Sequence, residues 1–201
     1  MTNSIVTGGA GFIGSHLVEE LLKIGHTVTA VDNEYADNDK FHWNDKAYNV
    51  RADITDYKSM KGAFANGQDY VFHCAAESRI GPAIANPINA VDINAKGTCT
   101  VLQCAREFGV KKVMYSSTSS GYGMNPSPNV ETQPDDCLNP YSVSKIAGEK
   151  LCKMYTDLFD LPTVIFRYFN VYGERAPRKG QYAPVIGIFQ RQKEAGESLT
   201  I

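Results

Sequence analysis

The chain has 201 residues, and its 20 Lys and Arg residues nearly balance its 22 Asp and Glu residues, which gives a formal net charge of −2. This length allows one well-packed core, or one complete domain with part of a second. The charge gives no field that would favour nucleic acid or a membrane surface, so neither partner is expected. No apolar run approaches the roughly 20 residues of a membrane span, and we expect no signal peptide before the first strand.

The five cysteines predict a reducing environment. They are odd in number and lack the C-x-x-C spacing of metal and redox sites. Cys99 and Cys104 lie five residues apart in a predicted helix, where we expect them to fill core space rather than bind metal. We therefore expect free thiols, no metal site and a cytoplasmic location.

Strand-like and helix-like segments alternate along the chain, as is typical of an α/β protein whose doubly wound parallel sheet has helices on both faces. Residues 33–46 are expected to form a loop or a short helix, and residues 116–140 are rich in Gly, Ser and Pro. A last strand is expected to begin at residues 199–201, with its continuation cut away. The predicted strands are residues 5–6, 27–31, 47–51, 69–74, 112–115 and 163–167, and the predicted helices are residues 15–22, 57–65, 87–108, 141–159 and 184–195.

The turn after the first predicted strand carries regularly spaced glycines. Residues 9–14 read G-x-G-x-x-G, and residues 8–14 read G-x-x-G-x-x-G. Between a strand and a helix, such a turn lets backbone N–H groups approach a pyrophosphate at the positive helix N-terminus. The motif alone is weak, but the strand before it and the helix after it favour a dinucleotide-binding Rossmann fold.

Asp32 completes this fingerprint. It ends the second predicted strand about 20 residues past the glycines, where a carboxylate accepts hydrogen bonds from a ribose 2′-OH. Its charge would repel a 2′-phosphate, so NAD(H) is favoured over NADP(H). The alternative is that Asp32 merely caps a turn before Asn33. The glycines upstream favour cofactor binding.

Tyr141 and Lys145 form the first candidate catalytic pair. Their i, i+4 spacing places them on one face of a predicted helix. A nearby ammonium favours the phenolate and would bring the phenol pKa from about 10 toward neutrality, so that Tyr141 could remove a proton from a substrate hydroxyl. An isolated Tyr-x-x-x-Lys is more often a helix-surface pair.

A run of hydroxyl residues follows the fifth predicted strand. Residues 115–123 read YSSTSSGYG and lie at the carboxyl end of that strand, the edge where doubly wound sheets bind ligands. Hydroxyls here could hold the reacting oxygen of a substrate. The alternative, a flexible Ser-rich loop, is less favoured because the run leaves an apolar strand.

Eight segments, in order and with fitting spacing, resemble the extended short-chain dehydrogenase/reductase family, and within it the nucleotide-sugar 4-epimerases. Together they are highly specific for the family and moderately specific for the subfamily. The similarity covers essentially the whole chain. The segments are residues 7–14, 32–33, 52–56, 73–76, 94–98, 115–117, 139–145 and 167–173.

The resemblance implies NAD as the cofactor and assigns residues to it. Gly8, Gly11 and Gly14 would lie under the pyrophosphate, and Asp32 would hold the adenosine ribose. The full set of residues that the resemblance places at the cofactor is Gly8, Gly11, Phe12, Ile13, Gly14, Asp32, Asn33, Asp53, Ile54, Ala75, Ala76, Asn94, Ser116, Tyr141, Lys145 and Tyr168.

The resemblance also assigns the chemistry. Tyr141 would be the base, and Lys145 would tune it while bonding the nicotinamide ribose. Counting back from Tyr122 and Gly123, the family's catalytic Ser/Thr falls on Thr118. The residues implied at the substrate are Thr118, Tyr141 and Asn170.

Some positions depart from the family pattern. Ser119 and Ser120 stand where the family's 4,6-dehydratases carry Asp and Glu, so dehydration is disfavoured. Gly121 replaces the usual Val, which we expect to give a looser turn. Ala83 replaces a common Ser, with a small expected effect on substrate contacts.

The favoured hypothesis is therefore NAD-dependent epimerisation at C4 of a UDP-hexose through a transient 4-keto sugar. The competing readings are another reaction on a nucleotide sugar (reductase, decarboxylase or 2-epimerase) and a non-catalytic NAD-binding module or fragment that needs a partner.

The resemblance also implies an organisation. Residues 1–173 would form the NAD-binding domain, and residues 174–201 would begin a nucleotide-sugar-binding region, since family members usually continue for on the order of 100 residues. A homodimer through the predicted helices 87–108 and 141–159 is expected. The apolar residues Val101, Leu102, Ile146 and Leu151 fit either that interface or the core.

Overall fold

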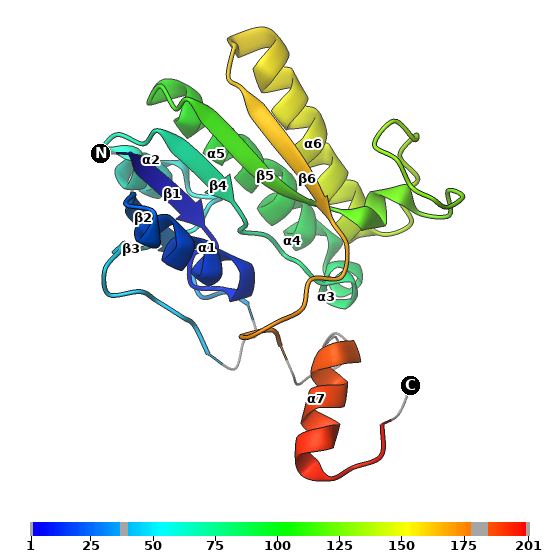
Figure 1. Cartoon of the computed structure of the whole chain (residues 1–201). Helices are drawn as coiled ribbons and strands as arrows, with labels where there is room; N and C mark the ends of the chain where they lie inside the picture. The colour runs from blue at the N-terminus through cyan, green and yellow to red at the C-terminus, as the bar shows by residue number, and fades with distance from the viewer. Residues whose placement is uncertain (1, 37–39, 178–184, 200–201) are drawn as a thin grey trace.

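A computed structural model describes residues 2–36, 40–177 and 185–199. The strands form one parallel sheet in the order β3-β2-β1-β4-β5-β6 (Figure 1). The strand order reverses between β1 and β4, which creates the switch point where such sheets bind ligands. The predicted doubly wound α/β fold is confirmed. The strands are β1 (Asn3–Thr7), β2 (Thr27–Asp32), β3 (Tyr48–Arg51), β4 (Tyr70–His73), β5 (Lys112–Thr118) and β6 (Thr163–Tyr168).

Local capping sets the bounds of the longest helix, α6. The Asn139 side chain accepts from the Ser142 N–H at 2.9 Å, and Pro140 fits the first helical turn. The helix ends at Asp160 in the left-handed conformation. The helices are α1 (Phe12–Lys23), α2 (Tyr57–Phe64), α3 (Ile80–Ala85), α4 (Pro87–Val91), the π-helical turn η1 (Asp92–Lys96), α5 (Gly97–Glu107), the 3₁₀ turn η2 (Ser119–Tyr122), α6 (Pro140–Phe159) and α7 (Val185–Ala195).

Several predicted bounds are corrected by this arrangement. The first helix begins at Phe12 instead of residue 15, and the fifth strand continues to Thr118, three residues past its predicted end. The predicted helix 87–108 is interrupted by η1, and α3 was not predicted. Leu199 is not in a strand, and the rest of that predicted strand lies outside the described residues.

The two faces of the sheet are covered unequally. The larger apolar cluster lies between the sheet and helices α2, α5 and α6, and includes Ile5, Phe64 and Leu102. A smaller cluster packs α1 against the other face through Val18 and Leu21. On that second face, Phe166 of β6 remains 42% exposed, so α1 covers only part of it within the described chain.

The long helices place their predicted interface residues in the core. Val101 and Leu102 are 0% exposed and Ile146 is 6% exposed, while Leu151 packs against the main cluster. The structure therefore resolves the alternative left open by the sequence in favour of the core. Any dimer contact through these helices needs other residues.

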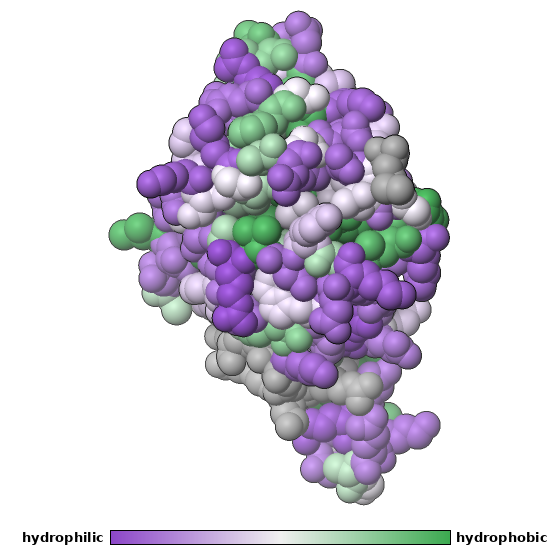
Figure 2. All heavy atoms as spheres, turned by 90° about the vertical axis from the view of Figure 1, so that its left-hand side faces the viewer, coloured by the Kyte–Doolittle hydropathy of each residue, from purple (hydrophilic) through white to green (hydrophobic). Residues whose placement is uncertain are grey.

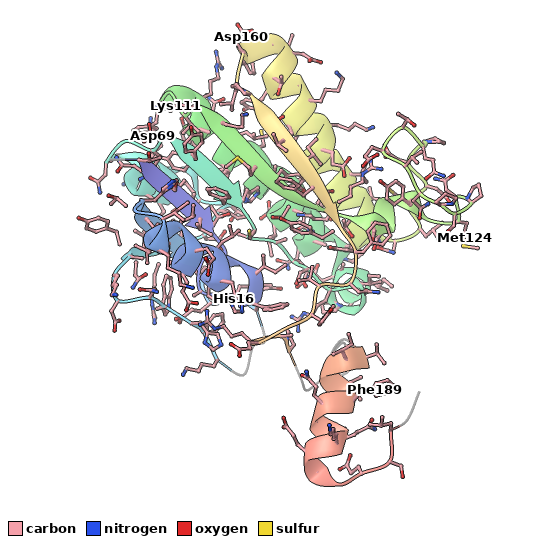
Figure 3. The ribbon with its side chains drawn as sticks, viewed as in Figure 1. His16, Asp69, Lys111, Met124, Asp160 and Phe189 are labelled. Atoms are coloured by element: carbon pink, nitrogen blue, oxygen red, sulfur yellow. The ribbon has the colours of Figure 1, made fainter. Side chains whose placement is uncertain are left out.

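The two ends of the sheet differ in character. At the amino ends of β4 and β5, Asp69 and Lys111 form an ion pair of 2.8 Å (Figure 3).

Figure 2 shows the side of the molecule at the left of Figure 1 to be mainly hydrophilic, with hydrophobic residues in small separate groups. Within the described residues, no helix is both long and apolar enough to cross a membrane. The carboxyl ends of the strands open instead into a large cavity.

Candidate active site

One cavity of about 950 Å³ runs along the carboxyl ends of the strands. It joins the glycine turn after β1 to the loops after β2 and β3, and continues to the ends of β5 and β6. Every residue predicted from the sequence for cofactor or substrate lines it, with the exception of Asn94. A single continuous site therefore collects residues from Gly8 to Asn170.

The glycine turn needs glycine at two positions for steric reasons. Gly8 has φ +70°, and a Cβ there would lie 2.8 Å from the backbone nitrogen of Ala75. A Cβ on Gly14 would overlap the Gly8 carbonyl oxygen. The chain can therefore pass from β1 into α1 this tightly only without side chains at both positions.

The N-terminus of α1 is arranged to receive an anion. Gly11 is its N-cap and supplies no side-chain hydrogen bond, so the N–H groups of the first turn have no acceptor within the helix. Phe12 and Ile13 belong to that turn and line the cavity. The turn thus fits a pyrophosphate held by backbone N–H groups and the helix dipole.

Asp32 serves both of the roles considered for it. Its carboxylate accepts from the Ala10 N–H at 3.1 Å and from the Glu34 N–H at 2.8 Å, so it does cap the turn after β2. The same side chain lines the cavity. Burial raises its pKa, and these hydrogen bonds oppose that rise. Each oxygen retains accepting capacity for a ribose hydroxyl.

A second polar pair fixes the loops beside Asp32. Asn33 donates its Nδ2–H to Asp53 Oδ2 at 2.8 Å, and Asp53 Oδ1 accepts from the Thr55 N–H at 2.7 Å. Burial opposes ionisation of Asp53, but these hydrogen bonds hold its pKa below the usual range. The loops after β2 and β3 are therefore joined where the resemblance places the adenine.

Tyr141, Thr118 and Lys145 meet at the other end of the cavity. Burial raises the pKa of Tyr141, and a hydrogen bond with Thr118 lowers it in opposition. Lys145 is 3% exposed, its Nζ lies 4.3 Å from the centroid of the Tyr115 ring, and burial lowers its pKa to about 8. The predicted lowering of the Tyr141 pKa is therefore opposed by burial, and the Thr118 hydrogen bond is the contact that acts in the predicted direction.

The neighbouring hydroxyls distinguish Thr118 from the serines before it. Ser116 Oγ pairs with Cys74 Sγ at 3.3 Å, and Ser117 Oγ donates to Glu149 Oε1 at 2.5 Å. Thr118 Oγ1 accepts from the Ser120 N–H at 3.1 Å, which leaves its own proton to donate. The residue predicted as the catalytic Ser/Thr is thus the one whose hydroxyl proton is free to be donated to Tyr141.

Gly121 corrects another expectation. A Cβ at this position would lie 2.5 Å from Ile146 Cδ1, and Gly121 is buried in η2. The turn is therefore closely packed against α6 instead of loose. Ala83 is 0% exposed and does not line the cavity.

Asn94 does not reach the cavity. Its side chain is 0% exposed, accepts from the Glu77 N–H at 2.8 Å, and donates to the Glu77 carbonyl oxygen at 3.0 Å and to Ser144 Oγ at 2.9 Å. These bonds tie the segment after β4 to α6. The predicted cofactor contact by this side chain is corrected to a structural role.

One charged residue of the site was not predicted. Arg79 lines the cavity with its side chain 28% exposed, and its Nε lies 3.5 Å from Glu77 Oε1. No sequence signal marked it beyond its place after the fourth strand. Outside the cavity, a set of contacts to α1 was also not predicted: His16, labelled in Figure 3, pairs through Nε2 with the Glu174 carbonyl oxygen at 2.9 Å, and Arg175 donates to Ser15 Oγ at 3.0 Å.

The chain matches the NAD dependent epimerase/dehydratase family over residues 4–201. It belongs to this family. A UDP-N-acetyl-alpha-D-glucosaminuronate decarboxylase of Bacillus cytotoxicus is 41% identical, with 98% of this chain and 63% of the relative covered. Thermotoga maritima UDP-glucose 4-epimerase, solved with UDP-glucose, is 33% identical with a TM-score of 0.93, over 98% of this chain and 64% of that one.

A third relative supports the cofactor. The Thermus thermophilus UDP-glucose 4-epimerase, solved in complex with NAD, is 33% identical with a TM-score of 0.89, over 100% of this chain and 65% of that one. Together with the family match and the glycine cradle, this confirms NAD as the predicted cofactor. The chain spans less than two thirds of the length of each of these three relatives.

Proposed function

We propose that this protein catalyses NAD-dependent epimerisation at C4 of a nucleotide sugar of the UDP-glucose/UDP-galactose type. The observation that carries the proposal is the convergence of Thr118, Tyr141 and Lys145 in the cavity that also holds the glycine turn and Asp32. Relatives described as UDP-glucose 4-epimerases support it.

Each residue has a role that follows from its position in the cavity. Thr118 donates to the reacting oxygen or to Tyr141, and Tyr141 takes the proton of the 4-hydroxyl. The hydride acceptor and donor for C4 would be supplied by NAD when bound. Lys145, whose pKa burial lowers to about 8, would hold the ribose of the cofactor. Asn170 lines the same cavity and is the proposed contact to the sugar diphosphate.

The other reactions of the family differ in the acids they require. Ser119 and Ser120 line the cavity where a dehydratase would need carboxylates, which disfavours elimination of water. Decarboxylation is the second candidate, because the Bacillus cytotoxicus relative is described as a decarboxylase. A uronic acid substrate would then lose CO₂ instead of changing configuration at C4.

We further propose the domain organisation implied by the sequence, with residues 1–173 binding NAD and residues 174–201 beginning the nucleotide-sugar-binding region. A homodimer is proposed through the outer faces of α4 and α6. Ile88, Val91 and Val143 are 84%, 47% and 51% exposed there. Replacement of Val143 by Glu should convert a dimer to a monomer in sedimentation velocity.

A cytoplasmic location remains part of the proposal. All five cysteines are free thiols, and Cys104 and Cys152 are buried. Free thiols of this kind persist in a reducing compartment.

Proton NMR of the purified chain with NAD and UDP-galactose tests the function. We expect the anomeric signal of UDP-glucose to appear. Tyr141→Phe should keep NAD binding and lose turnover by about 100- to 10,000-fold, the range for a positioned acid or base. Tyr155→Phe is the matched control, because Tyr155 lies on α6 and donates to Gln103 away from the cavity. Equal turnover in wild type and Tyr141→Phe would reject Tyr141 as the base.

A further inference from the structure

A buried ion cluster lies directly behind the catalytic end of the cavity. Arg167 of β6 donates from Nε to Glu149 Oε1 at 2.9 Å and from Nη2 to Glu149 Oε2 at 2.7 Å, which makes a two-pronged pair. Arg167 Nη2 also donates to Asp135 Oδ1 at 2.8 Å. The Glu149 and Arg167 side chains are only 9% and 12% exposed. We call Ser117, Asp135, Glu149 and Arg167 the Glu149–Arg167 cluster.

Ser117 and Glu149 lie close in sequence to residues of the proposed catalytic machinery, and Arg167 is paired with both of them. Ser117 precedes Thr118 on β5 and donates its hydroxyl proton to Glu149. Glu149 lies one helical turn after Lys145 and two turns after Tyr141, on the same face of α6. Ser117 stands opposite Arg167 in the register of β5 and β6. The cluster thus joins β5, α6 and β6 at the depth where the cavity is built.

The energetics of such a pair favour a geometric role. Desolvation makes a buried ion pair a poor source of net stability compared with apolar packing. The hydrogen bonds of the pair are directional, however, so they fix the spacing between α6 and β6, which carry the two side chains. Because Glu149 holds both Ser117 and Arg167, the carboxylate fixes α6 at a set distance from the end of β5. Tyr141 lies on the same helix and Thr118 at the same strand end, so this spacing also governs how closely they approach.

We infer that Glu149 and Arg167 are positioning residues, which hold the Thr118 hydroxyl against the Tyr141 phenol by fixing the end of β5 to α6. The inference rests on the proposed function for its meaning, since that function makes Tyr141 the base. Neither Glu149 nor Arg167 lines the cavity. Their effect reaches the site through Ser117 on one side and through α6 on the other.

The hydrogen bond from Thr118 offers a direct measure, because it lowers the pKa of Tyr141. Tyrosine labelled with ¹³C at Cζ gives one NMR signal per residue, and the Tyr141 signal is assigned by its loss in Tyr141→Phe. Thr118→Val removes the hydrogen bond and should shift the Tyr141 titration to higher pH. This variant sets the reference shift for the test.

Glu149→Gln should shift the Tyr141 titration upward, in the same direction as Thr118→Val. The double variant should match Thr118→Val alone, because Glu149 acts only through Thr118. A purely through-space effect has the opposite sign, since removing a negative charge lowers a phenol pKa. A downward shift, no shift, or an additive double variant would overturn the inference.

Two further variants keep the test decisive. Arg167→Lys retains the charge but not the two-pronged geometry, and should also raise the Tyr141 titration. It replaces Glu149→Gln if that variant does not fold. Cys152→Ala is the matched control: Cys152 is buried on the same helix, its backbone carbonyl accepts hydrogen bonds from Thr156 and Thr163 outside the cluster, and loss of its thiol should leave the titration unchanged. No substrate is needed, so absence of epimerase turnover would reject the proposed function while this test still decides the positioning role.

Discussion

The two ends of the cavity are built by different means. At the pyrophosphate end, the site is formed mainly by backbone groups of the turn between β1 and α1, together with the Asp32 side chain that ends β2, all within the first 32 residues of the chain. At the catalytic end, side chains from β5, α6 and β6 meet through buried bonds such as Arg167 to Glu149, across 18 residues of sequence. A local backbone site tolerates little change in shape, whereas a site assembled from distant side chains depends on charge and spacing.

The largest effect is expected where the backbone itself forms the site. Gly14→Ala places a Cβ against the Gly8 carbonyl oxygen, and no flexible side chain can yield there. We expect a loss of about 3 kcal/mol in stability, together with loss of NAD binding, measured by denaturant unfolding and calorimetry. Gly62→Ala on α2 is the control, since its Cβ meets nothing within 4 Å and should stabilise by about 0.5–1 kcal/mol. Equal effects at both positions would refute the steric account.

The buried His73 of β4, between β1 and α5, should make the fold acid-sensitive. Its ring pairs with Thr7 Oγ1 at 2.7 Å and Thr98 Oγ1 at 2.9 Å, and burial lowers its pKa to about 3. Between pH 6.5 and 3 the unfolded chain binds the extra proton, so stability falls as the pH falls. We expect a loss of about 3 kcal/mol between pH 6.5 and 4, measured by urea unfolding. His73→Gln should lack this component, and an unchanged slope in that variant would contradict the assignment.

Asp32 tests whether charge also matters at the backbone-built end. Asp32→Asn keeps the shape of the side chain but removes its charge, so NAD should bind about 10- to 100-fold more weakly. Binding of NADP should improve relative to NAD, because the repulsion of the 2′-phosphate is gone. Calorimetry with both dinucleotides measures the ratio. Asp69→Asn at the opposite end of the sheet should leave it unchanged.

The smallest effect is expected at Gly121, where the catalytic end is closely packed. A Cβ there meets the flexible tip of Ile146, so Gly121→Ala should cost about 1 kcal/mol. Ile146→Val removes the clashing methyl group, and the double variant should recover most of that loss in thermal unfolding. An additive double variant would show that the strain lies in the backbone.

The sequence predicted what depends on local pattern. The glycine spacing, Asp32 and the alternation of strands and helices follow from residues near one another, and the cavity collects them as expected. The short helix α3 escaped prediction because Gly81 and Pro82 weaken its helical pattern.

Long-range bonds account for the rest. The Glu149 to Arg167 pair joins two elements, and the Arg175 contact with Ser15 crosses 160 positions. The burial that raises the pKa of Tyr141 also arises from packing of the whole domain. The spacing of Glu149 four residues after Lys145 was the one available signal for the cluster.

The most direct test of the central claim uses UDP-galactose carrying deuterium at C4, incubated with the chain and NAD. Tyr141 removes only the hydroxyl proton in this account, and the C4 hydrogen leaves and returns within the same site without exchange with solvent. UDP-glucose should therefore form with its deuterium retained at C4, as read by mass spectrometry and NMR. Product that has lost the deuterium to solvent, or no product, would contradict the account.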